Sequence, residues 1–158
     1  MSNLNIVKAC MSSDRISGLK GDHVVAAALG EFVIIDSYHL LDVWKIELAK
    51  TIHLFFVIVI PDLNKCSISK RESENHTLKL ISSMEKGDLK TLGCMLSKDG
   101  SVRSNWIPGF EEVKNVVIYV VSLGFTISGS GPTVVGVTDN EEMAFNIAAK
   151  IVVTFDEI

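Results

Sequence analysis

The stretch from residue 125 to residue 137 reads Phe125-Thr126-Ile127-Ser128, then Gly129-Ser130-Gly131-Pro132, then Thr133-Val134-Val135-Gly136-Val137. Its two outer segments are short and rich in β-branched residues, which favours β-strands. The four residues between them form turns readily, because glycine accepts positive φ angles and proline fixes φ. We therefore predict a β-hairpin, and with it an antiparallel sheet, in the later part of the chain.

A helix and a strand are predicted after this hairpin. Asp139, with Glu142 three residues later, has the pattern of a capping box and predicts a helix through Met143, Ile147 and Ala148. Residues 151–155 are mostly β-branched or aromatic, so we predict that they close the sheet as a strand.

The longest apolar run of the chain lies before the hairpin, from Leu54 to Ile60. A strand that is apolar on both faces is typical of the middle of a sheet, so we predict that residues 52–60 form a central strand. Helices are predicted over residues 77–85, over a short segment that Asp88 caps, and over residues 110–123. Residues 97–105 are predicted to form a loop.

We predict smaller elements in the first third of the chain. Residues 4–16 and 24–29 favour helices, the second of them ended by Gly30, and residues 32–35 favour a strand. Residues 38–51 have no clean period and predict no element. The whole pattern predicts an α+β fold, with helices on one face of a largely antiparallel sheet.

Composition limits the classes of function. The 158 residues are 47% hydrophobic and carry a net charge of −4, which excludes a disordered chain and argues against binding nucleic acid or an anionic membrane. The apolar run is too short to span a bilayer, and we expect a cytoplasmic protein because the first residues do not resemble a signal peptide. The three cysteines, Cys10, Cys66 and Cys94, are expected to be reduced thiols.

Few residues suggest chemistry by themselves. The turn at residues 129–132 could direct backbone N–H groups toward an anion, or it could be an ordinary hairpin turn. Arg71 and Arg103 could each hold a carboxylate or phosphate, although a solvated surface arginine is the commoner case. The four histidines have no metal-ligand spacing, so no metal site is expected, and no Walker phosphate loop is present.

Several segments, in order along the chain, resemble the GHMP small-molecule kinases. Residues 126–133, Thr-Ile-Ser-Gly-Ser-Gly-Pro-Thr, are similar to the third signature motif of that family. Residues 107–114, Ile-Pro-Gly-Phe-Glu-Glu-Val-Lys, preceded by Arg103, resemble its homoserine kinase branch, as do residues 59–62, Val-Ile-Pro-Asp. Residues 21–27 and 29–33 resemble the family segments H-A-D-N-V-A-P and L-G-G-F-V.

The resemblance implies the carboxyl-terminal part of such a kinase. Residues 51–158 would be the ferredoxin-like carboxyl-terminal domain, and residues 1–50 a remnant of the end of the amino-terminal domain. The family transfers the γ-phosphoryl group of ATP, with magnesium, to the hydroxyl of L-homoserine in threonine biosynthesis. Its phosphate loop, P-x-x-x-G-L-G-S-S-A, is absent from these 158 residues. We therefore expect weak or no activity from this chain alone, and no binding of ATP or magnesium to it.

The resemblance also suggests site residues. Ser67, Arg71, Arg103 and Gly129 match positions that face the amino-acid substrate. Ser128, Gly129, Ser130 and Gly131 match the loop near the transferred phosphoryl group. Asp22 matches the aspartate of the H-A-D-N segment, whereas Lys20 and His23 replace its histidine and asparagine. Asp22 and His23 are candidates for a catalytic contact. No catalytic residue is assigned.

Two kinds of partner follow from this reading. The substrate would be homoserine, and the apolar surface left by a missing amino-terminal half would favour a homo-oligomer or a separate chain supplying that half. The alternative is a non-catalytic module that binds an amino acid or takes part in assembly.

Overall fold

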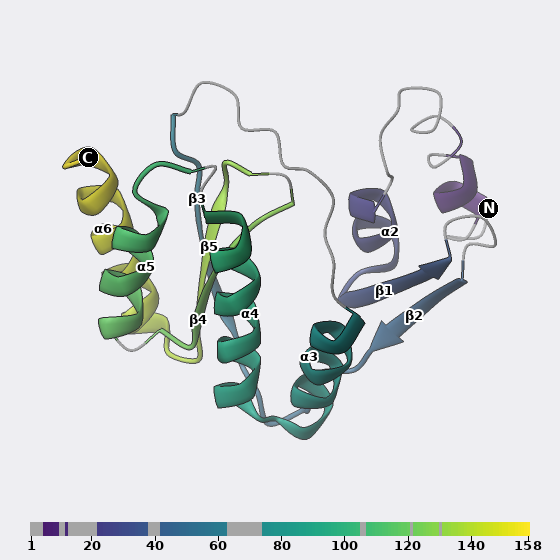
Figure 1. Cartoon of the computed structure of the whole chain (residues 1–158). Coiled ribbons are helices and arrows are strands. Elements are labelled where there is room, and N and C mark those ends of the chain that lie inside the picture. The colour runs from purple at the N-terminus through teal and green to yellow at the C-terminus, as the bar shows by residue number, and fades with distance from the viewer. Residues whose placement is uncertain are drawn as a thin grey trace. The chain divides into compact units, whose positions relative to one another are not determined.

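Two units make up the fold of the computed structural model, Met1–Leu48 and Ala49–Ile158. The structure describes residues 5–9, 12, 22–37, 42–62, 74–104, 107–120, 122–129 and 131–158 (Figure 1). Each unit has its own buried cluster of apolar side chains, and each is described separately below.

Unit 1 is a small helical layer with a two-stranded sheet. Residues 5–9 are helical, followed by α2 (Asp22–Leu29), β1 (Phe32–Ser37) and β2 (Asp42–Ile46). Gly30 follows the last residue of α2 and has a φ of 73°, the left-handed conformation in which many helices end. Strands β1 and β2 are antiparallel, and Val7 and Val25 are fully buried between the helices and this pair.

The helix at residues 24–29 and the strand at residues 32–35 are therefore confirmed. Strand β2 was not predicted. Its residues, Asp-Val-Trp-Lys-Ile, mix charged and apolar side chains, and pairing with β1 rather than local propensity makes them a strand.

In its described residues, unit 2 contains three strands and four helices. In chain order they are β3 (Phe55–Val59), α3 (Glu74–Lys86), α4 (Leu89–Arg103), α5 (Phe110–Tyr119), β4 (Gly124–Ile127), β5 (Val134–Thr138) and α6 (Glu141–Asp156). The sheet is antiparallel throughout, in the order β3-β5-β4. This α+β architecture is the one predicted from the sequence.

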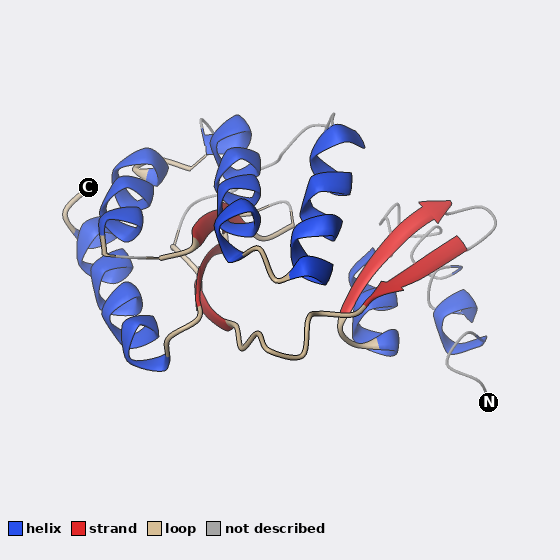
Figure 2. Cartoon of the chain, turned by 90° about the horizontal axis from the view of Figure 1, so that it is seen from below, coloured by secondary structure: helices blue, strands red, loops and turns tan. Residues whose placement is uncertain are grey.

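Helices α5 and α6 lie side by side and cover one face of the sheet (Figures 1 and 2). Their contact side chains follow helical spacing: Phe110, Val113 and Val117 on α5 are buried. On α6, Ile147 and Ile151 are fully buried. The rings of Phe110 and Phe125 meet with centroids 5.0 Å apart, which joins α5 to β4 at the centre of this core.

Helix α4 packs against β4 with their backbones in direct contact. A Cβ atom added to Gly93 would collide with the carbonyl oxygen of Leu123, and one added to Gly124 would lie 2.7 Å from the carbonyl oxygen of Gly93. Ser97 Oγ accepts a hydrogen bond of 3.1 Å from the N–H of Phe125, so α4 covers the outer edge of β4.

Several predictions for unit 2 are wrong. Among the strands that the structure describes, β3 lies at one end of the sheet rather than in its middle, which β5 occupies. Residues 151–155 continue α6 instead of forming a strand. Residues 97–103 belong to α4 rather than to a loop.

The start of α6 also differs from the prediction. Its N-cap is Asn140, one residue after the predicted Asp139. The Asn140 side chain accepts the N–H of Met143 at 3.0 Å, while the N–H of Asn140 is bound by Thr138 Oγ1 at 3.3 Å. The hydroxyl of Thr138 thus fixes Asn140 in the extended conformation that an N-cap needs.

Candidate functional site

The glycine-rich turn between β4 and β5 is an exposed hairpin loop. The N–H of Ser128 donates to the carbonyl of Thr133 at 2.8 Å, and the N–H of Gly131 donates to the carbonyl of Ser128 at 2.9 Å. Gly129 and Gly131 have φ angles of 55° and 74°, and a Cβ atom on Gly129 would meet nothing within 4 Å. Glycine is therefore required at Gly129 by backbone conformation, while the space beside it is open to a ligand.

A second part of the candidate site is the junction between α4 and α5. Arg103 is the last residue of α4. Buried Ser104 accepts the N–H of Ile107 through its carbonyl at 3.0 Å, and the carbonyl of Ile107 accepts the N–H of Phe110 at 3.1 Å. These turns lead directly into α5, whose N-cap Gly109 has a φ of 75°.

The turn and the junction lie at the same end of unit 2. Figure 1 shows the last turn of α4, the first turn of α5 and the β4–β5 turn together at the upper end of the three strands, where β3 also ends. The antiparallel topology produces this arrangement, because α4 and β4 both run toward that end and α5 and β5 both leave it.

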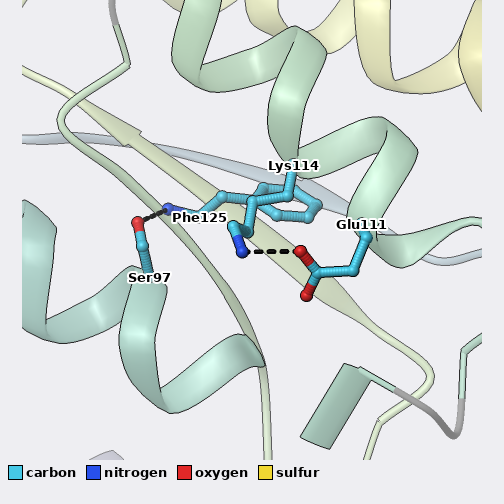
Figure 3. A network of polar contacts seen from close by, with 4 residues as sticks. All are labelled: Ser97, Glu111, Lys114 and Phe125. Atoms are coloured by element: carbon cyan, nitrogen blue, oxygen red, sulfur yellow. Dashed lines mark hydrogen bonds and ion pairs between the residues drawn. The ribbon is translucent and has the colours of Figure 1, made fainter. Parts of the chain in front are cut away.

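A partly buried ion pair lies beneath the junction. Lys114 Nζ is 2.7 Å from a carboxylate oxygen of Glu111, one helical turn earlier on α5. The Lys114 side chain is only 15% exposed, against 45% for Glu111. In Figure 3 the lysine chain extends from α5 into the space between Ser97 on α4 and the first turn of α5. The Lys114 ammonium is therefore paired within its own helix, close to the first residues of α5.

The structure describes some of the predicted site residues and not others. The backbones of Arg103, Ser128, Gly129 and Gly131 are placed at the end of unit 2 just described. Ser67, Arg71 and Ser130 lie outside the described residues. Asp22 and His23 are the first two residues of α2, in unit 1.

Sequence reasoning did not single out Lys114 or Ser97. Two signals could have found the pair: Glu111 and Lys114 have the i, i+3 spacing that allows a helical ion pair, and both stand in the family-like segment of residues 107–114. The hydrogen bond from Phe125 to Ser97 joins residues 28 positions apart, so it depends on tertiary structure.

Among the described residues, no group of three or more His, Cys, Asp or Glu side chains is placed to hold a metal ion. In the same part of the chain, none of the helices has the length and hydropathy of a membrane-spanning segment.

Part of the chain matches a known protein family. Residues 80–155, from within α3 to within α6, match the family described as GHMP kinases C terminal. Residues 80–155 form a GHMP kinase carboxyl-terminal domain. The resemblance predicted from the sequence is thereby confirmed, and the β4–β5 turn and the α4–α5 junction both lie within this GHMP domain.

Similar proteins extend the match to unit 1. Homoserine kinase from Arabidopsis thaliana is 33% identical over 160 aligned positions, which cover 91% of this chain and 43% of that protein. Homoserine kinase from Chloroherpeton thalassium is 27% identical and covers 99% of this chain and 54% of that protein. The chain thus spans about half the length of these relatives.

A solved structure shows the same fold. The crystal structure of homoserine kinase from Cytophaga hutchinsonii superposes with a TM-score of 0.84 over 99% of this chain and 55% of that one, at 24% sequence identity. The chain is therefore homoserine kinase-like in sequence and fold, over a region that includes the GHMP domain.

Proposed function

We propose that this chain supplies the substrate-facing part of a homoserine kinase, the part that binds L-homoserine and borders the transferred phosphoryl group. The observation that carries the proposal is the 33% identity to a homoserine kinase along 91% of the chain. In this proposal residues 51–158 are the substrate-binding domain, and residues 1–50 are the end of the domain that binds the nucleotide.

The geometry of the GHMP domain supports this role. Phosphoryl transfer depends on positioning the reactants and stabilising charge, with little covalent chemistry for the protein. The last residue of α4 and the exposed Gly129 turn lie at one end of the sheet, and Lys114 stands below the first turn of α5. Arg103 would bind the homoserine carboxylate there as a bidentate partner, with Ser67 and Arg71 as further contacts.

The residues near the phosphoryl group would come from the β4–β5 turn. Ser128 and Gly129 are exposed at its tip, and Gly129 leaves open space where a side chain would otherwise stand. Ser130 and Gly131 complete the loop that would approach the γ-phosphoryl group. ATP and magnesium would be bound mainly by residues outside this chain, because no Walker-type or P-x-x-x-G-L-G-S-S-A phosphate loop occurs in the 158 residues. Cytoplasmic threonine biosynthesis would be the setting of the reaction.

A chimeric enzyme tests the proposal. The amino-terminal part of the Arabidopsis homoserine kinase, which this chain does not cover, would be joined to residues 1–158 and assayed for ADP release with L-homoserine. We expect activity that is saturable in homoserine. Arg103→Ala and Arg71→Ala should each weaken homoserine binding by about 2–5 kcal/mol, measured as an increase in KM.

The matched control is Lys98→Ala, which removes an exposed positive charge from the same helix as Arg103. It should leave KM nearly unchanged. Equal effects of the three substitutions would show that diffuse surface charge acts, and the proposed site would be wrong. A folded chimera that binds homoserine without phosphorylating it would favour the non-catalytic amino-acid-binding module instead.

A further inference from the structure

Phe125 on β4 contacts both helices of the α4–α5 junction. Its N–H donates a hydrogen bond of 3.1 Å to Ser97 Oγ on α4 (Figure 3). Its ring lies 5.0 Å, between centroids, from that of Phe110, the first residue of α5. Both aromatic side chains are buried. The position of β4 at Phe125 is therefore fixed from two helices at once.

The Ser97 hydroxyl takes the place of a neighbouring strand. Among the described strands of unit 2, β4 is the last in the order β3-β5-β4, so no strand supplies an acceptor on its outer side. Ser97 Oγ supplies one to the N–H of Phe125. Because Phe125 is fully buried, loss of this acceptor would leave a buried N–H without its partner, which is costly.

This hydrogen bond also fixes the position of α4 along β4. One helical turn before Ser97, the backbones of the two elements touch at Gly93 and Gly124. That contact sets how closely the helix approaches the strand, but two glycines have no side chains that would oppose sliding. A hydrogen bond is directional, so the bond between Ser97 and Phe125 sets the register of the helix on the strand.

Both elements run on from this bond to the candidate site. Arg103 lies six residues after Ser97 on α4, about 9 Å at 1.5 Å per helical residue. Gly129 lies four residues after Phe125, at most about 13 Å at 3.3 Å per strand residue. A shift of α4 along β4 would therefore displace the end of the helix relative to the β4–β5 turn.

We infer that Ser97 is a positioning residue of the proposed phosphoryl transfer. Through Phe125 it keeps the end of α4, where Arg103 would bind the homoserine carboxylate, in register with the turn that would approach the phosphoryl group. The inference rests on the proposed function for the reaction, whereas the bond between Ser97 and Phe125 does not. Alignment of the reacting groups matters because a misplacement of about 1 Å can lower a rate about 100-fold.

Amide hydrogen exchange in the 158-residue chain tests the bond itself. In Ser97→Ala, the exchange rate of the Phe125 N–H should rise about tenfold more than that of Ile147 on α6, whose rate reports global stability. Ser97→Thr, which keeps a hydroxyl, should retain the protection of Phe125. An equal rise at both amides in Ser97→Ala would show that Ser97 contributes only to global stability, and the inference would be wrong.

Kinetics of the chimeric enzyme test the effect on transfer. Ser97→Ala should lower kcat about tenfold and change the KM for homoserine less than about threefold, because the substrate still binds but its hydroxyl is out of line. Arg103→Ala should instead act mainly on KM, since it removes a binding contact. Ser97→Thr should restore kcat to within about twofold of the unsubstituted chimera.

The matched control is Ser83→Ala on α3. Ser83 is also a buried serine, but its hydroxyl donates at 2.7 Å to the carbonyl of Leu80 in the same helix. It should leave kcat unchanged. Equal losses of kcat in the two alanine variants, or an unchanged kcat in Ser97→Ala, would overturn the inference. A chimera without homoserine-dependent activity would overturn the proposed function and the role of Ser97 in transfer, while exchange at Phe125 would still decide whether Ser97 fixes β4.

Discussion

At the start of α4, one carboxylate holds the first turn of the helix. Asp88 accepts the N–H of Thr91 at 3.0 Å with one oxygen and the Thr91 hydroxyl at 2.6 Å with the other. The Thr91 hydroxyl first, and then the Thr91 N–H, lower the pKa of Asp88 below its ordinary value. The predicted capping role of Asp88 is confirmed, and the pair fixes the helix that ends at Arg103.

Stability should depend on pH through this cap. Because the pKa of Asp88 is lower in the folded than in the unfolded chain, its contribution is complete above the unfolded pKa of about 3.9 and is lost as pH falls toward the folded pKa. Asp88→Asn should therefore flatten the fall in the free energy of unfolding below about pH 4.5, measured by urea titration at several pH values. An unchanged pH profile in this variant would show that the cap carries no such linkage.

The same substitution at two threonines of the sheet should change the free energy of unfolding in opposite directions. Thr126 Oγ1 is buried and has no hydrogen-bond partner among the residues that the structure describes, whereas Thr138 Oγ1 accepts the N–H of Asn140. Thr126→Val should raise the free energy of unfolding by about 1 kcal/mol, and Thr138→Val should lower it by about 1–2 kcal/mol. Chemical denaturation of both variants checks this; destabilisation by Thr126→Val would mean that its hydroxyl is bound after all.

At the scale of elements, the sequence predicted those helices and strands that have distinctive residues at their ends. A helix was predicted over residues 110–123 from Pro108 before it, acidic residues in its first turn and Gly124 after it. The helix is confirmed as α5 (Phe110–Tyr119), but its predicted end is wrong, because Gly124 begins β4. The β4–β5 hairpin was predicted for the same reason, since its turn residues are distinctive.

The sequence did not predict the elements whose conformation depends on tertiary contacts. Residues 151–155 have strand composition, yet Ile151 and Phe155 repeat the four-residue spacing of Ile147 against the sheet, and that burial outweighs a small loss in helix propensity. For β3, an apolar sequence could not reveal which of its faces and edges would be covered. Strand β2 has no period of its own and forms by pairing.

The helical path of residues 151–155 can be tested directly. Ile151 is fully buried against the sheet, while Val152 is 47% exposed. Ile151→Ala should lower the free energy of unfolding by about 2–5 kcal/mol, and Val152→Ala by less than about 1 kcal/mol. Thermal or urea unfolding measures both; a larger effect at Val152 would contradict the helix assignment.

At the scale of the whole molecule, the sequence predicted the family and fold but only part of the site. Arg103 and Gly129 could be selected because they stand in segments of recognisable spacing. That the end of α4 and the Gly129 turn lie at one end of the sheet depends on the antiparallel order of the strands, which the sequence did not specify completely. The Lys114–Glu111 pair lies within α5 and follows from its i, i+3 spacing, whereas the hydrogen bond from Phe125 to Ser97 depends on how α4 packs against β4.

The 158-residue chain alone should not bind ATP. No segment provides the glycine-rich cradle with lysine or serine that a triphosphate needs, so we expect a Kd weaker than about 1 mM. Calorimetry with Mg-ATP measures this, and inorganic phosphate serves as the control ligand for the Gly129 turn. A micromolar Kd for ATP would reveal a nucleotide site in these residues.

The contact between Gly93 and Gly124 has a consequence for the gene. With only backbone between α4 and β4, neither position has room for even one added methyl group. Every missense change in either codon therefore forces the helix and the strand apart, which displaces Ser97 and the end of α4 at Arg103 together. In a saturation library selected for folded protein, these two codons should lose all their missense alleles, while the neighbouring codon of exposed Cys94 keeps many.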